Sequence, residues 1–148
     1  MNLRLPLPAL GLAAALAGCA GESVEPSEAY KALEPVEYPF AHVFESVTSA
    51  FQEEGFAIAR SHRQGERADV VSRMGPVRRD LIAEVEETRR LRARIAPGTR
   101  GLRVSLAASV LRRRPYEEWR YAGRDDALLE RVARRFRSAL ARPYRPGG

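Results

Sequence analysis

The sequence has few of the residues on which disulfides and metal sites depend. Its single cysteine, Cys19, excludes an intramolecular disulfide and a cysteine-based zinc site. Only two histidines, His42 and His62, could supply nitrogen ligands to a metal. We therefore expect no metal and no cofactor. The apolar run Leu5–Ala17 has 13 residues, fewer than the roughly 20 that cross a bilayer as a helix. The composition, 30% charged residues, also excludes a polytopic membrane protein.

Lysine is almost absent, and the charges are unevenly distributed. Lys31 is the one lysine among 25 basic residues, and the remainder are arginines. Residues 20–58 hold eight acidic residues against Lys31, whereas residues 59–148 hold 23 arginines against 11 acids. This asymmetry predicts an anionic partner, or an acidic front that folds back on a basic body. A GC-rich genome would produce much of the same arginine excess without any binding function.

The sequence also lacks a recognisable catalytic pattern. No glycine-rich phosphate-binding loop occurs, since the glycines at 75, 98, 101 and 123 are isolated turn formers. Four adjacent pairs of acids occur, and neighbouring side chains point apart on a strand or lie about 100° apart on a helix. None of these pairs therefore predicts a carboxylate dyad, and we expect the protein not to be an enzyme. The four pairs are Glu53-Glu54, Glu86-Glu87, Glu117-Glu118 and Asp125-Asp126.

The N-terminus carries the most specific motif. A short start with one positive charge, Arg4, precedes the apolar run, as in a signal peptide. The run leads into Leu16-Ala17-Gly18-Cys19, which resembles the lipobox of bacterial lipoproteins. The alternative is an ordinary secretory signal in which the cysteine occurs by chance.

The lipobox resemblance implies a covalent membrane anchor. In that family the cysteine sulfur, here that of Cys19, is linked to diacylglycerol, and a signal peptidase that reads Leu16, Ala17 and Gly18 cuts before it. The new amino group usually receives a further acyl chain such as palmitate, and two or three chains hold a protein on a bilayer effectively permanently. Alanine at position 20, rather than aspartate, implies the periplasmic face of the outer membrane.

The pattern beyond Cys19 divides the chain into parts. Residues 1–18 form the predicted signal peptide, and residues 19–39 the lipidated cysteine followed by an acidic segment with three prolines. No helical or alternating pattern runs through this segment, so we expect a disordered tether that reaches roughly 60 Å when extended. Its residues 27–33 are also compatible with a short helical turn. Residues 40–144 form the predicted domain, and residues 145–148 a tail.

Hydrophobic periodicity predicts the elements of the domain. One helical face joins Phe40, Val43, Phe44, Val47, Ala50 and Phe51, with His42 off that face; a second joins Leu128, Leu129, Val132, Phe136, Ala139 and Leu140. Between the helices, alternation predicts two hairpins from segments 56–60, 68–74, 91–95 and 102–111. Segment 80–88 is compatible with a helix or a strand.

The order α-β-β-β-β-α predicts an α+β fold. We expect a two-layer sandwich, in which two helices cover one face of a four-stranded antiparallel sheet. This order resembles small bacterial envelope lipoproteins of the outer-membrane assembly type, which have a helix-grip-like domain. The resemblance implies an assembly or scaffolding role through contacts with another envelope protein.

A cluster of arginines and aromatic rings is the candidate surface for a ligand or partner. It consists of Arg112, Arg113, Arg114, Tyr116, Trp119 and Tyr121. Such residues suit a protein partner or an anionic envelope polymer, such as lipopolysaccharide phosphates or peptidoglycan. In the alternative interpretation Trp119 closes the edge of the core and the arginines are solvated. Export argues against nucleic acid as the partner.

Overall fold

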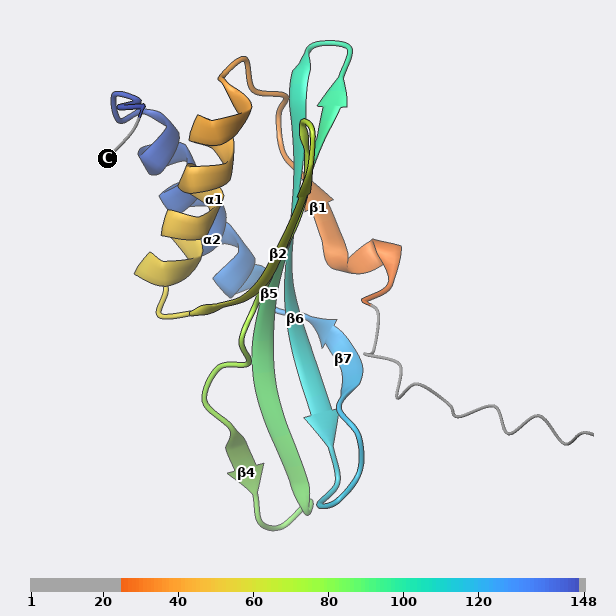
Figure 1. The fold of residues 1–148 in the computed structure, drawn as a ribbon. Helices are drawn as coiled ribbons and strands as arrows, with labels where there is room; N and C mark the ends of the chain where they lie inside the picture. Colours follow the sequence, from red (N-terminus) through yellow and green to blue (C-terminus); the bar gives the residue numbers. More distant parts are fainter. Residues whose placement is uncertain (1–24, 147–148) are drawn as a thin grey trace, which may run out of the picture.

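The computed structural model describes residues 25–146 and shows an α+β fold of two layers (Figure 1). Two helices, α1 (Phe40–Glu53) and α2 (Asp126–Leu140), lie side by side on one face of an antiparallel sheet of seven strands. The predicted fold class and the helix layer are therefore confirmed. The lipobox at residues 16–19 lies outside the described residues.

The two helices include the segments in which the sequence shows apolar helical faces. The apolar faces of both helices enter a common core, in which Phe51 and Phe136 are the largest buried side chains. Gly55, with φ +85°, follows the C-terminus of α1, a position that favours glycine. Asp125 caps α2 by accepting a hydrogen bond of 2.9 Å from the backbone N–H of Leu128.

The sheet has seven strands, and the expectation of four is wrong. Four strands follow in the order β6 (Gly101–Arg113), β5 (Val85–Gly98), β3 (Arg67–Ser72) and β2 (Ile58–Gln64). Three more, of three to five residues, lie at the edges: β1 (Tyr30–Ala32), β4 (Arg78–Asp80) and β7 (Arg120–Arg124). Strands this short carry too few residues for an alternating pattern to be recognised.

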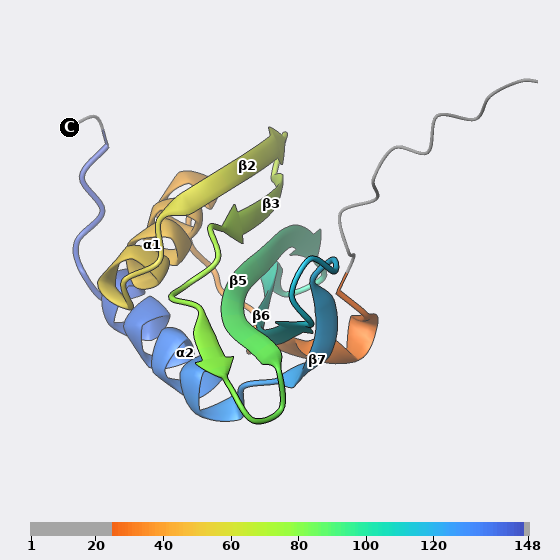
Figure 2. The same ribbon diagram turned by 90° about the horizontal axis from the view of Figure 1, so that it is seen from below.

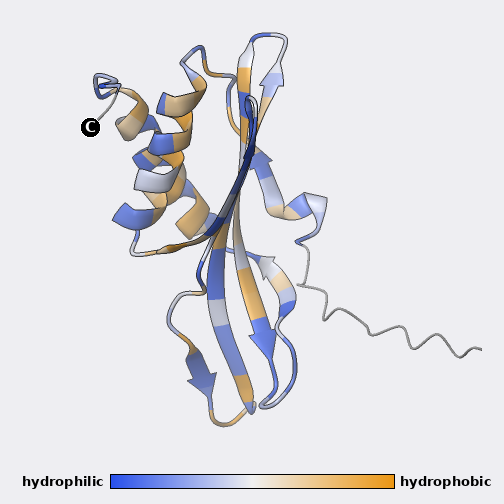
Figure 3. Ribbon diagram, in the orientation of Figure 1, coloured by the Kyte–Doolittle hydropathy of each residue, from blue (hydrophilic) through white to orange (hydrophobic). Residues whose placement is uncertain are grey.

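The hairpin of β5 and β6 organises the sheet. Both strands are long and strongly curved (Figure 2). Residues Arg92–Ile95 of β5 pair with β3, whereas its first three residues pair with β4. Segment 80–88 thus resolves into the end of β4, a turn and the start of β5. Apolar residues line the contact of this hairpin with the helices, while the β4 end of the sheet is mostly hydrophilic (Figure 3).

The acidic segment before α1 is not a disordered tether over residues 25–39. It forms a 3₁₀ turn, η1 (Ser27–Ala29), then β1, and its Val36 pairs with Leu102 of β6. Gly101 permits this approach, since a Cβ there would lie 2.5 Å from the carbonyl oxygen of Val36. The segment needs no regular spacing of apolar side chains, because its backbone pairs with β6 at the edge of the sheet.

His42, which lies off the predicted apolar face of α1, is nevertheless shielded from solvent. The side chain is buried, and its Nε2 lies 2.9 Å from the carbonyl oxygen of Leu140. Its ring packs between Tyr38 and Tyr144. The histidine thus connects α1 with the C-terminus of α2. The pattern of apolar residues alone does not reveal this contact.

Candidate functional site

Two turns meet at the end of the sheet drawn at the bottom of Figure 1, which we call the distal end. Residues 81–84 connect β4 with β5, and residues 114–119 connect β6 with β7. Leu81 and Ile82 are 85% and 98% exposed, and Tyr116 is fully exposed. Three large apolar side chains at adjacent tips form a surface suited to a partner.

The backbone presents these side chains in a defined geometry. The carboxylate of Asp80 accepts hydrogen bonds of 3.0 Å from the backbone N–H groups of Ile82 and Ala83. Glu84 and Tyr116 have φ values of 51° and 68°, and no other non-glycine residue among 25–146 has a positive φ. Strained backbone of this kind concentrates at functional sites, and here both instances fall at the distal end.

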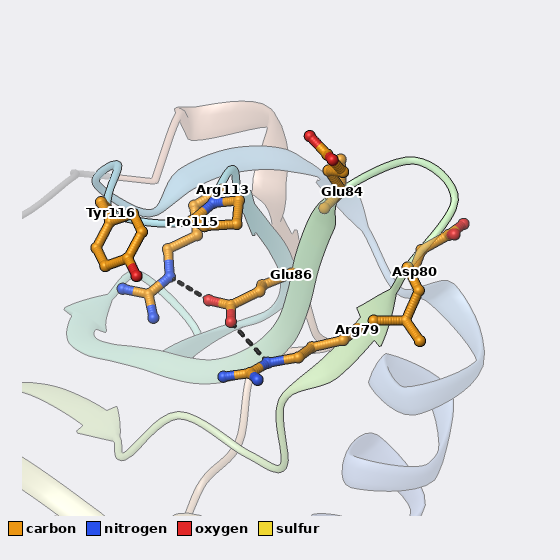
Figure 4. A pocket seen from close by; sticks show the side chains of 9 residues that line it. Arg79, Asp80, Glu84, Glu86, Arg113, Pro115 and Tyr116 are labelled. Atoms are coloured by element: carbon orange, nitrogen blue, oxygen red, sulfur yellow. Dashed lines mark hydrogen bonds and ion pairs between the residues drawn. The ribbon is translucent and has the colours of Figure 1, made fainter.

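A cavity of about 610 Å³ opens between the two turns (Figure 4). Glu86 lies at its centre, with one carboxylate oxygen 2.7 Å from Arg113 and the other 2.8 Å from Arg79. The hydrogen bond from Arg113 is the main cause of the lowered pKa of Glu86, so the carboxylate stays ionised. Asp80 and Glu84 line the cavity as well, so its three acids outnumber its two arginines, which makes the cavity a poor site for an anion.

The predicted arginine and aromatic cluster does not form one patch. Arg112 and Arg113 lie on opposite faces of the sheet, because they are adjacent in a strand, and they pair with Glu87 and Glu86 at 2.7 Å each. The guanidinium of Arg113 lies 4.3 Å from the ring centre of the half-buried Trp119. This arrangement favours the interpretation in which Trp119 covers the edge of the fold.

The remaining members of the cluster are separated as well. Arg114 is exposed in the turn beside Tyr116. Tyr121 is half-buried on β7, where it pairs with Leu111 of β6. Only Arg114 and Tyr116 therefore present side chains to a ligand at the distal end itself.

A second set of arginines occupies the sheet face opposite the helices, which we call the outer face. Residues paired across antiparallel strands share a face. His62, Asp69, Arg94 and Ser105 form one such row, and the next row includes Gln64, Arg67 and Arg103. The alternation of Arg92 and Arg94 with Leu91, Ala93 and Ile95 predicts a basic outer face for this hairpin. The candidate ligand surface predicted from the sequence, however, is the arginine and aromatic cluster instead.

A buried ion network connects the N-terminal segment to the outer face. Glu25, whose side chain is fully buried, accepts from Arg90 at 2.6 and 2.7 Å and lies 2.7 Å from Arg92. Burial alone would lower the pKa of Arg92, but Glu25 and Tyr30 reverse this effect and raise it. The acidic front thus folds back on the basic body, which was one of the two outcomes that the charge asymmetry predicted.

Neither models of known protein families nor curated proteins give a match to this chain. No helix of the described residues is long and apolar enough to cross a membrane. Within residues 25–146, no group of three or more histidine, cysteine or acidic side chains is placed to hold a metal ion. The function is therefore argued from the surfaces and the N-terminal motif.

Proposed function

We propose that the protein is a lipid-anchored, non-catalytic component of the bacterial cell envelope. Acyl chains on Cys19 hold it on the membrane, at the periplasmic face of the outer membrane, and it serves assembly or scaffolding through contacts with another envelope protein. The apolar run that ends in Leu16-Ala17-Gly18-Cys19 supports the anchor. Because five residues lie between Cys19 and Glu25, this anchor holds the domain close to the membrane.

The exposure of Leu81 and Ile82 carries the proposal of protein contacts. Protein interfaces have an apolar centre with aromatic residues and arginine enriched, and the distal end offers Tyr116 and Arg114 beside the two aliphatic tips. Since the acids of the cavity, Asp80, Glu84 and Glu86, offset its two arginines, binding of a protein there would depend on apolar area rather than on positive charge.

Photo-crosslinking in intact cells tests this surface. A crosslinking amino acid in place of Ile82 should give one discrete adduct with an envelope protein, and adding Leu81→Glu should abolish it. The matched control replaces Ser138, an exposed residue of α2 on the other layer, and should give no such adduct. Equal crosslinking from both positions, or none from either, would refute a protein contact at the distal end.

A second candidate function is a tethered binding module for an anionic envelope polymer. The arginines of the outer face favour it, because Arg67, Arg94 and Arg103 are exposed and form no ion pair within the described residues. Binding of lipopolysaccharide or peptidoglycan fragments should then weaken steeply as salt is raised. Binding that is insensitive to salt would reject this candidate.

A further inference from the structure

Strand β4 has one edge that no other strand of residues 25–146 covers. It pairs with β5 alone, at the margin of the sheet, and all three of its residues are exposed (Figure 1). An open edge presents unpaired backbone N–H and C=O groups, to which a further strand can be added, and proteins commonly protect such edges with charged side chains. The side chains along β4 therefore decide whether its edge repels or accepts another strand.

Exposed apolar side chains stand at both ends of β4. Val77 precedes the strand and is 48% exposed, and Leu81 follows it and is 85% exposed. Side chains alternate along an extended chain. Continued as a strand at both ends, β4 would therefore place Val77, Arg79 and Leu81 on one face, and Arg78 and Asp80 on the other.

The two charged side chains of that second face form no ion pair within the described residues. Arg78 is exposed. Asp80 uses one carboxylate oxygen to accept hydrogen bonds of 3.0 Å from the backbone of the following turn, and its second oxygen remains available. Arg79, by contrast, is paired with Glu86 at 2.8 Å. β4 thus offers one cation and one anion to a strand that would pair with it.

The sequence around β4 is complementary to itself when two copies run antiparallel about Arg79. Val77 of each copy then lies opposite Leu81 of the other, and Arg78 lies opposite Asp80. Residues opposite one another share a face, with Cβ atoms about 5 Å apart, so two apolar contacts and two ion pairs can form. The two Arg79 side chains meet at the axis, but each is already paired with a carboxylate of its own copy.

The other edge strands lack this property. β1, β2 and β7 each contain basic residues and no acid, so two copies of any one of them would offer no ion pair to each other. None of these three strands is directly followed or preceded by a large exposed apolar side chain within the described residues. β4 alone combines charges of both signs with exposed apolar residues at its ends.

We propose that two copies of the chain pair through β4 and form a dimer with two-fold symmetry, in which their sheets join edge to edge. The dimer goes beyond the proposed function, because the pairing uses Val77 and Leu81 and leaves Ile82 and Tyr116 of both copies to an envelope partner. An isologous contact of this kind needs a self-complementary surface. The shared edge is short, and acyl chains on Cys19 would favour the dimer by confining both copies to one membrane surface at high effective concentration.

A disulfide across the symmetry axis tests the pairing. The chain from residue 19 to 148 with Cys19→Ser contains every described element and no cysteine. Arg79→Cys then places two thiols opposite one another, on Cα atoms about 4.5–5.5 Å apart, within reach of a disulfide. Oxidation should trap a covalent dimer. Ser61→Cys, at the centre of the exposed edge strand β2, is the matched control and should remain monomeric.

Two further cysteine variants test the register. In the proposed dimer, the two copies of Val77 lie about 13 Å apart along the strands, which is too far for a disulfide. Val77→Cys or Leu81→Cys alone should therefore give no covalent dimer, whereas a mixture of the two should give a mixed disulfide. Failure of Arg79→Cys to crosslink, or equal crosslinking of Ser61→Cys, would overturn the proposal.

Charge reversal tests the ion pairs. Added to Arg79→Cys, either Arg78→Asp or Asp80→Arg places like charges opposite one another twice, and should weaken association and slow crosslinking about ten-fold. A mixture of the two variants restores both opposite-charge pairs and should crosslink as a heterodimer at the rate of Arg79→Cys.

Recovery in the mixture requires that both variants fold, so it separates loss of pairing from misfolding. No loss in the single variants, or a loss without recovery in the mixture, would refute pairing through β4. None of these assays needs an acyl chain, so their failure is distinct from failure of the lipid anchor.

Discussion

Removal of the Glu25 carboxylate should destabilise the whole domain. Glu25→Ala leaves two buried guanidinium groups, of Arg90 and Arg92, that lose contacts of 2.6–2.7 Å. Breaking a buried ion network in this way costs about 3–5 kcal/mol. That is a large fraction of the 5–15 kcal/mol by which a typical domain is stable.

Urea unfolding of the chain from residue 19, with Cys19→Ser, measures this cost. The midpoint should fall for Glu25→Ala with an unchanged dependence on urea, which indicates a change in stability alone. Glu28→Ala is the matched control, because it removes an exposed acid from the 3₁₀ turn that follows Glu25 and should change the free energy of unfolding by less than about 0.5 kcal/mol.

Truncation provides an independent comparison. A chain that begins at Tyr38 lacks β1 and Glu25, and should lose at least as much stability as Glu25→Ala. If Glu25→Ala and Glu28→Ala have equal effects, or if the truncated chain unfolds at the midpoint of the parent, then the ion network does not hold the N-terminal segment and the reasoning is wrong.

Three further predictions concern the domain. Phe136→Ala should cost about 3–5 kcal/mol in urea unfolding, whereas Arg134→Ala on the exposed side of α2 should cost less than about 0.5 kcal/mol; equal costs would contradict the helix orientation. Asp125→Ala should cost about 1 kcal/mol through loss of the helix cap, and a cost near zero would show that the cap is dispensable. Ile82→Ser should leave the unfolding midpoint unchanged, because the side chain is already exposed; a large loss would show that it packs against the fold.

The acid dependence of stability should also report on Asp125. Burial opposes its ionisation, but hydrogen bonds from Leu128 and Arg89 outweigh burial and lower the pKa of the carboxyl. A carboxyl with a depressed pKa in the folded state stabilises the fold above its ordinary value of 3.8 and loses that contribution as the pH falls. Asp125→Asn should therefore flatten the loss of stability below pH 3.8, and an unchanged profile would contradict this assignment.

The parts of the fold that bury apolar faces could be predicted from the sequence. The stripe through Val132 and Phe136 and the alternation of Val104 and Leu106 place these side chains in the core, as the structure shows. Such patterns identify a helix or strand because its apolar residues recur at one spacing along its whole length. The two helices and the long hairpin were therefore recognisable.

Elements fixed by single interactions could not be predicted in this way. One buried carboxylate, that of Glu25, and backbone pairing with β6 hold the N-terminal segment. Neither interaction requires a regular spacing of apolar residues that the sequence would show. The pairing of Glu86 and Glu87 with arginines on opposite faces depends on the register of β5 and β6. For that reason the run Arg112-Arg113-Arg114 resembled a basic patch in the sequence although the structure divides it.

The mass of the N-terminal peptide tests the central proposal most directly. The protein is extracted from membranes with detergent and digested, and its first peptide is weighed. Our account predicts a peptide that begins at Cys19 and carries diacylglycerol on the sulfur and a further acyl chain on the amino group, while Cys19→Ala yields no acylated peptide. A mature protein with an unmodified Cys19, or with an N-terminus at another residue, would contradict the account.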